Sequence, residues 1–182
     1  MASTRVTTDD YLASPETRLP QELVYGLVRD AAAPAPLHQW AVGEIFSCFR
    51  AHLAQQRCGR AWMAPIDVVL DRERGLVVQP DVIVVLNQRQ HIVSDRVWGA
   101  PDLVVEVMSP HVRIGRVEER LEWFGRYGVR ECWLVHPLEP RIEVITFGTS
   151  PIVSRTFTRD DVVQSPVLEH LSATPASILT SY

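Results

Sequence analysis

The sequence contains no lysine. All 18 of its basic residues are arginine, and the 22 acidic residues give the chain a formal net charge of −4. With this balance no overall positive field draws the protein onto nucleic acid, so any such binding has to come from a local patch. Arginine stays protonated and binds phosphate well, but it is a poor proton shuttle. The chemistry open to a cationic group in this protein is restricted accordingly.

Long apolar runs and metal-spaced cysteines are missing as well. No hydrophobic stretch approaches the roughly 18 residues that a membrane span requires, and residues 1–10 lack the apolar segment of a secretory signal. The three cysteines, Cys48, Cys58 and Cys132, are scattered along the chain, which indicates reduced thiols. We therefore expect a cytoplasmic protein that has no contact with a membrane.

The length and composition are those of an ordinary globular protein. The chain has 182 residues, of which 46% are hydrophobic and 22% charged, so it is long enough to bury a substantial core. No repeat, low-complexity tract or linker divides it. We predict one domain over residues 1–182, with a core at about residues 20–147 and a C-terminal β extension over residues 148–182.

Hydrophobic periodicity predicts two main helices among several strands. Residues 37–56 and 113–127 show the 3–4 spacing of amphipathic helices, and Gly59 and Gly128 are placed to end them. Strands are predicted at residues 22–30 (two short strands with a turn near Gly26), 61–70, 76–86, 102–108, 131–137 and 141–147. This order predicts a mixed α/β sheet with helices on its faces.

Two acidic residues lie in strongly apolar strands, and they are the most informative feature of the chain. Asp81 opens the run Val-Ile-Val-Val-Leu just after Pro80, and Glu106 lies within Leu-Val-Val-Glu-Val. An ionised carboxylate among apolar side chains costs free energy unless a metal, an arginine or hydrogen bonds compensate its charge. If the two strands are neighbours, the acids can point to one side and form a magnesium site.

Structural roles compete with this interpretation. Arg120 lies at the edge of the apolar face of the second helix, where its side chain can reach the sheet and pair with Glu106 in a structural salt bridge. Asp102, which follows a proline at a strand start, is typical of a turn or cap. His38, at the start of the first helix, is either a hydrogen-bonded structural histidine or part of a site.

Several motifs together resemble the Uma-type family of putative restriction endonucleases, within the PD-(D/E)xK nuclease superfamily. They are Pro-Asp at residues 80–81, Pro-Asp-Leu-Val-Val-Glu-Val-Met-Ser-Pro at 101–110, and Phe-Gly-Arg-Tyr-Gly-Val-Arg-Glu-Cys-Trp-Leu-Val-His-Pro at 124–137. Glu22 and His38 also match the family pattern. The resemblance covers roughly residues 8 to 175 and implies a restriction-endonuclease-like fold, a mixed β-sheet flanked by helices.

The resemblance also implies a function and a site. Asp81 and Glu106 would be metal-binding acids that take Mg²⁺ or Mn²⁺, Arg120 would stabilise charge, and Glu22 and His38 would complete the pocket. The implied activity is endonucleolytic hydrolysis of DNA phosphodiester bonds, and the implied assembly is a homodimer.

The chain departs from the family pattern at the cationic half of this site. In the wider superfamily a lysine lies two residues after the second acid, where this chain has Met108; in this family the lysine comes from the following helix, four residues before an aromatic, where this chain has Arg120. Further departures are Arg116, Cys132 and His136. Because arginine is a poor general base, we expect weakened or lost cleavage, and the alternative function is an inactive nuclease fold that serves as a DNA-binding or interaction module.

Overall fold

Two mixed β-sheets and their flanking helices make up the computed structural model, which describes residues 5–15, 17, 19–109 and 114–179. The larger sheet has six strands in the order β11 (Val153–Thr158), β10 (Arg141–Thr146), β9 (Glu131–His136), β8 (Leu103–Val107), β6 (Val82–Leu86) and β3 (Gly59–Met63). The smaller sheet has five strands in the order β2 (Leu27–Asp30), β1 (Gln21–Val24), β5 (Leu76–Val78), β4 (Val68–Asp71) and β7 (Val97–Trp98).

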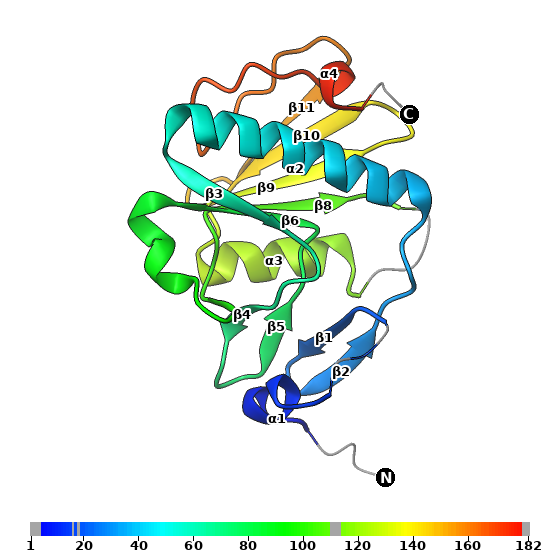
Figure 1. Ribbon diagram of the computed structural model, residues 1–182, viewed down its shortest axis with the longest axis vertical. Helices are drawn as coiled ribbons and strands as arrows, with labels where there is room; N and C mark the ends of the chain where they lie inside the picture. The colour runs from blue at the N-terminus through cyan, green and yellow to red at the C-terminus, as the bar shows by residue number, and fades with distance from the viewer. Residues whose placement is uncertain (1–4, 16, 18, 110–113, 180–182) are drawn as a thin grey trace.

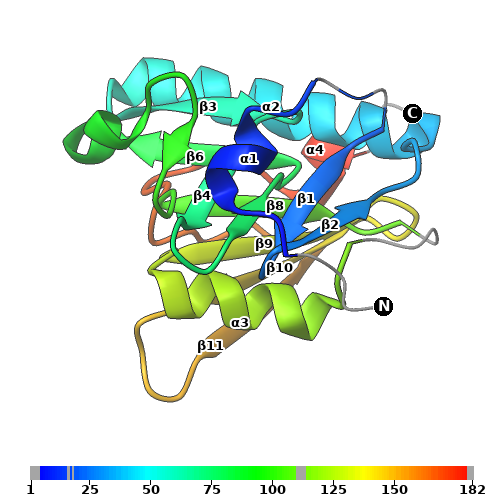
Figure 2. The ribbon, with the colours of Figure 1, turned by 90° about the horizontal axis from the view of Figure 1, so that it is seen from below.

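Helices lie on both faces of the six-stranded sheet, as the sequence predicts. Figures 1 and 2 show α2 (Pro36–Gln56) on one side and α3 (Val117–Tyr127) on the other. The pair β8–β9 is parallel while the other pairs of this sheet are antiparallel, and α3 is the crossover that a parallel pair requires. The remaining helical segments are α1 (Thr8–Leu12), η1 (Asn87–Ile92) and α4 (Pro175–Leu179).

Alternation along β8 divides its side chains between two cores. Leu103, Val105 and Val107 pack under α2, whereas Val104 packs against α3 and the smaller sheet. The residues after β11 close the α2 side, where Val163 and Leu168 join the same core. None of the described helices is both long and apolar enough to cross a membrane.

Two of the predicted strands are wrong as continuous elements. The expected strand 61–70 is divided into β3 and β4, and the expected strand 76–86 into β5 and β6, because the chain passes at both places from one sheet to the other. Prolines stand at both crossings, Pro65 and Pro80, and a residue without an N–H cannot continue a ladder of hydrogen bonds. Within the smaller sheet β4 and β5 pair antiparallel as a hairpin.

The first helix ends at Gln56, as predicted, but Gly59 is not the residue that ends it. Arg57, with a positive φ of 51°, caps α2 by donating its backbone N–H to the Leu53 carbonyl, and Gly59 instead begins β3. A Cβ at Gly59 would lie 2.7 Å from the carbonyl oxygen of Val85, so a glycine is needed for the close pairing of β3 with β6. Gly128 caps α3 with a φ of 95°, as predicted.

Candidate metal and phosphodiester site

Asp81 and Glu106 come from neighbouring strands. β6 and β8 pair antiparallel as far as Val82 and Val105; Asp81 immediately precedes β6, and Glu106 is the next residue of β8 beyond that pair. The Asp81 backbone N–H donates to the Val105 carbonyl over 3.1 Å, and its Oδ2 accepts from the Val107 N–H over 2.6 Å. The passage of the chain from one sheet to the other at Pro80 thus places the Asp81 side chain at the end of β8.

Glu106 points toward α3 and meets Arg120 there. The guanidinium Nε and Nη2 of Arg120 donate to Glu106 Oε1 over 3.0 and 2.7 Å. Both side chains are almost fully buried, with 6% of the Glu106 side chain and 5% of the Arg120 side chain exposed. The salt bridge that the sequence offered as a structural alternative therefore forms.

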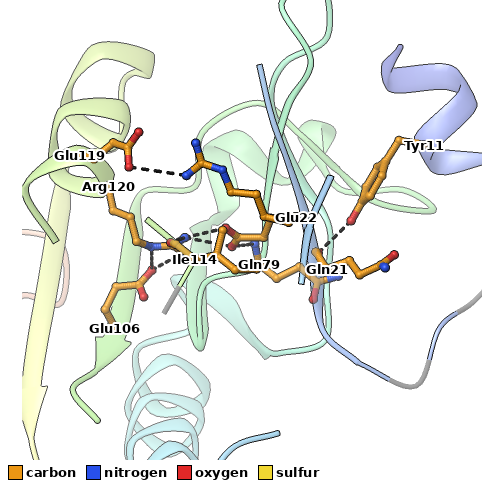
Figure 3. Close-up of polar contacts among 9 residues, drawn as sticks. Tyr11, Gln21, Glu22, Gln79, Glu106, Ile114, Glu119 and Arg120 are labelled. Carbon is orange, nitrogen blue, oxygen red and sulfur yellow. Dashed lines mark hydrogen bonds and ion pairs between the residues drawn. The ribbon is translucent and has the colours of Figure 1, made fainter. Parts of the chain in front are cut away.

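Glu22, on β1 of the smaller sheet, binds the same guanidinium from the opposite side (Figure 3). Arg120 Nη1 donates to Glu22 Oε2 and Oε1 over 2.7 and 3.0 Å, and the Gln79 N–H donates to Glu22 Oε1 over 2.7 Å. Burial alone would lower the pKa of Arg120, but the charges of Glu106 and Glu22 and their hydrogen bonds raise it above its usual value. The side chain is thus a permanent cation that joins both sheets through α3.

His38 reaches the site from the first turn of α2. Its Nε2 lies 3.3 Å from Asp81 Oδ2, a distance at which an Nε2–H can donate to the carboxylate. Its Nδ1 is buried and has no hydrogen-bond partner among the described residues. The histidine is therefore placed to orient the Asp81 side chain, as a site residue would be.

All five residues that the sequence singled out for the site line one pocket of about 600 Å³. Its wall also contains polar residues that the sequence analysis did not identify, namely Tyr11, Asp67, Gln79 and Arg96. Gln79 Nε2 donates to Asp67 Oδ1 over 2.9 Å, and Arg96 Nε lies 3.4 Å from Asp67 Oδ2. No spacing in the sequence signals these contacts, because they depend on how the smaller sheet is placed against the larger one.

Asp102 does not belong to the pocket. It lies at the opposite end of β8, only 1% exposed, where its Oδ2 accepts from the Leu86 N–H over 2.8 Å and its Oδ1 lies 3.4 Å from Arg130 Nη1. Its function is to tie together strands β6 and β8, which is more than the turn or cap expected from sequence. His111, which follows the predicted strand at residues 102–108, lies outside the described residues.

Asp81 and Glu106 are the residues of this pocket that would hold a divalent cation. No cluster of three or more His, Cys, Asp or Glu with metal-binding geometry occurs in the part of the chain that the structure describes. Mg²⁺ does not require one, since it commonly takes one or two carboxylates and fills its remaining positions with water and substrate phosphate. Asp81 and Glu106 on facing strands, both hard oxygen donors in one pocket, fit that pattern.

The architecture is a restriction-endonuclease-like fold. A crystal structure described as "a putative nuclease belonging to DUF820 from Anabaena variabilis" superimposes with a TM-score of 0.82, over 96% of this chain and 98% of that chain, at 21% sequence identity.

The family follows from the sequence match. The model of the Uma2 family, described as "putative restriction endonuclease", matches residues 8–176. The chain therefore belongs to the Uma2 family, which confirms the resemblance drawn from its motifs. A comparison with curated proteins yields no significant match.

Proposed function

We propose that this protein is a metal-dependent endonuclease that hydrolyses phosphodiester bonds of DNA in the pocket around Asp81 and Glu106. The observation that carries the proposal is that Asp81, just before β6, and Glu106, on the neighbouring strand β8, line one pocket in a chain of the Uma2 family. Hydrolysis of the superfamily type would add water at phosphorus and leave a 5′-phosphate and a 3′-hydroxyl.

Asp81 and Glu106 are the residues that would hold Mg²⁺ or Mn²⁺. When bound, such an ion lowers the pKa of a coordinated water and offsets negative charge on the phosphoryl oxygens. The protein's own contribution is to keep the two carboxylates in place. Val107 and His38 hold Asp81, while Arg120 holds Glu106.

Arg120 is the third residue of the proposed site, and its chemistry limits the rate of cleavage. Its fixed positive charge beside Glu106 can stabilise negative charge that develops on a phosphate. It cannot readily accept a proton, because the neighbouring carboxylates hold it in the charged form. We therefore expect slower cleavage than the same site would give with lysine at this position.

Plasmid nicking with Mg²⁺ or Mn²⁺ tests the assignment. Asp81→Asn and Glu106→Gln should each abolish nicking, whereas Asp160→Asn, a change of an exposed acid on the far C-terminal segment, should leave it intact. Arg120→Lys should increase the nicking rate. Nicking that persists at the wild-type rate in both acid variants would refute the site.

A binding function without cleavage is the second candidate. It is favoured by the engagement of Arg120 with both Glu22 and Glu106, since an internal cation already compensates these acids. Metal that raises the melting temperature, with no nicking of any DNA under the same conditions, would select this function. Loss of that shift in Asp81→Asn would show that the metal binds in the pocket.

We further propose a homodimer formed through the six-stranded sheet. β11 is one of its two terminal strands, with Val153 38% and the preceding Ile152 59% exposed, and its outer edge pairs with no other strand in the part of the chain that the structure describes, so it offers backbone groups for pairing. Light scattering after size-exclusion chromatography should give twice the chain mass of 20.6 kDa, and Val153→Lys should give the monomer.

A further inference from the structure

The reacting groups lie at the enclosed end of the pocket. As whole residues, Glu22, Glu106 and Arg120 are only 3%, 5% and 4% exposed, and 17% of the Asp81 side chain is exposed. A scissile phosphate has to enter the pocket to reach them. The accessible surface around the acids is too small for a broad substrate to lie across.

Two segments that are close in sequence form the walls in front of the acids. One comprises the described lining residues between Tyr11 and Glu22, and the other those between Ala31 and Gln39. Much of the lining is small and apolar: Pro15, Leu19, Pro20, Ala31, Ala32, Ala33, Pro34, Ala64, Pro65 and Ile66. Such a lining offers apolar contacts to the faces of bases and sugars, and it offers no charge to a row of phosphates.

The described lining offers few cations to a phosphate backbone. It contains two arginines, Arg96 and Arg120, and both are held in ion pairs with acids of the same pocket. A protein that binds along duplex DNA relies on many contacts from arginine or lysine to successive phosphates. The described lining of the pocket thus suits a short segment of nucleic acid better than a length of duplex.

We propose that the pocket takes a single-stranded segment of DNA, roughly one or two nucleotides long given a pocket of drug-ligand size, and excludes the intact duplex. A strand end, a flap or a nucleotide extruded from a duplex would supply such a segment, whereas paired DNA would first have to open, at a cost of a few kcal/mol. This inference rests on the proposed function and specifies its substrate.

Cleavage rates on three substrates of one sequence test the inference: a single-stranded oligonucleotide, the blunt duplex, and the duplex with a single-stranded flap. The cost of unpairing predicts that the single strand and the flap are cleaved at least about tenfold faster than the duplex. Equal or faster cleavage of the duplex overturns the inference and leaves the proposed nuclease activity standing.

Absence of cleavage on every substrate would instead reject the proposed nuclease activity. The inference is then decided by fluorescence anisotropy with the same oligonucleotides. Binding of the single strand at least about tenfold tighter than the duplex supports it, and any smaller preference overturns it.

A variant that fills the pocket away from the acids gives an independent test. Ala33→Trp places a large side chain in an exposed stretch of the wall, and Ala54→Trp places the same side chain on an exposed position of α2 outside the pocket. Ala33→Trp should weaken single-strand binding at least about tenfold with an unchanged melting temperature, and Ala54→Trp should bind as the wild type does. Equal binding by the two variants overturns the inference.

Discussion

Replacing Arg120 by methionine should destabilise the protein strongly. Arg120 makes four hydrogen bonds to the carboxylates of Glu22 and Glu106, and all three residues are buried. Methionine of similar length leaves two carboxylates buried without a counter-charge. Removing one partner of a buried ion pair costs about 3–5 kcal/mol in free energy of unfolding, and here two acids lose the same partner. Urea denaturation at neutral pH measures the loss.

The loss should depend on pH in a definite direction. Without the arginine, the buried carboxyls are more stable when protonated, so the folded variant binds protons more tightly than the unfolded chain does. Its stability should therefore rise as the pH falls from 8 toward 5, and the gap to the wild type should narrow. Measurements over this pH range, on both proteins in the same buffer series, give the comparison.

Two controls separate charge from packing. Arg120→Lys keeps the positive charge but loses the planar guanidinium that donates to both Glu22 and Glu106. It should lower the free energy of unfolding by only about 2 kcal/mol, the size of one hydrogen bond to a charged group. Glu22→Gln and Glu106→Gln combined with Arg120→Met should recover much of the stability lost by Arg120→Met alone. A cost of less than about 1 kcal/mol for Arg120→Met, independent of pH, would refute the reasoning.

Other substitutions test the framework around the site. Glu131 is fully buried, accepts hydrogen bonds from Trp133 Nε1, Ser165 Oγ and the Val167 N–H, and has its pKa raised by burial against those bonds. The free energy of unfolding should therefore fall as the pH rises from the pKa of glutamate in the unfolded chain, near 4.3, through the higher pKa of Glu131 in the folded protein. Glu131→Gln should remove this fall, which urea denaturation over the same pH range measures. Gly43→Ala in α2 meets nothing within 4 Å and should stabilise the protein by about 0.5–1 kcal/mol in thermal denaturation. Gly125→Ala in α3 places a Cβ 2.9 Å from Phe147 and should destabilise by about 1–3 kcal/mol, so a stabilised Gly125→Ala would contradict the packing. Asp102→Ala should cost about 1–3 kcal/mol because the half-buried Leu86 N–H loses its acceptor, whereas the nicking rate per folded molecule should not change.

The site was predictable from sequence to the extent that local chemistry marks it. Asp81 and Glu106 stand out because carboxylates are rare inside apolar strands, and the angular position of Arg120 predicted a side chain that reaches the sheet. The magnesium interpretation and the salt-bridge alternative both involved Glu106, the first with Asp81 and the second with Arg120. The pairing of Glu106 with Arg120 is now observed, and the binding of metal stays a prediction.

The sequence by itself determined the elements that local patterns control. Periodicity located α2 and α3, although α3 begins only at Val117 and not at residue 113; the glycine after Tyr127 predicted the end of α3, and alternation along β8 places Glu106 on the other face from the residues that pack under α2. These features depend on neighbours a few positions apart, so they can be identified before the fold is known.

Only the tertiary structure decided where the chain changes sheets and what that brings together. The crossings near Pro65 and Pro80 divide two apolar runs that look continuous in sequence, and they set the smaller sheet against α3. As a result Glu22 meets an arginine 98 positions away, and residues 11–22 wall a pocket whose acids lie on other strands. Contacts of this kind depend on packing between distant elements, which no local pattern of residues encodes.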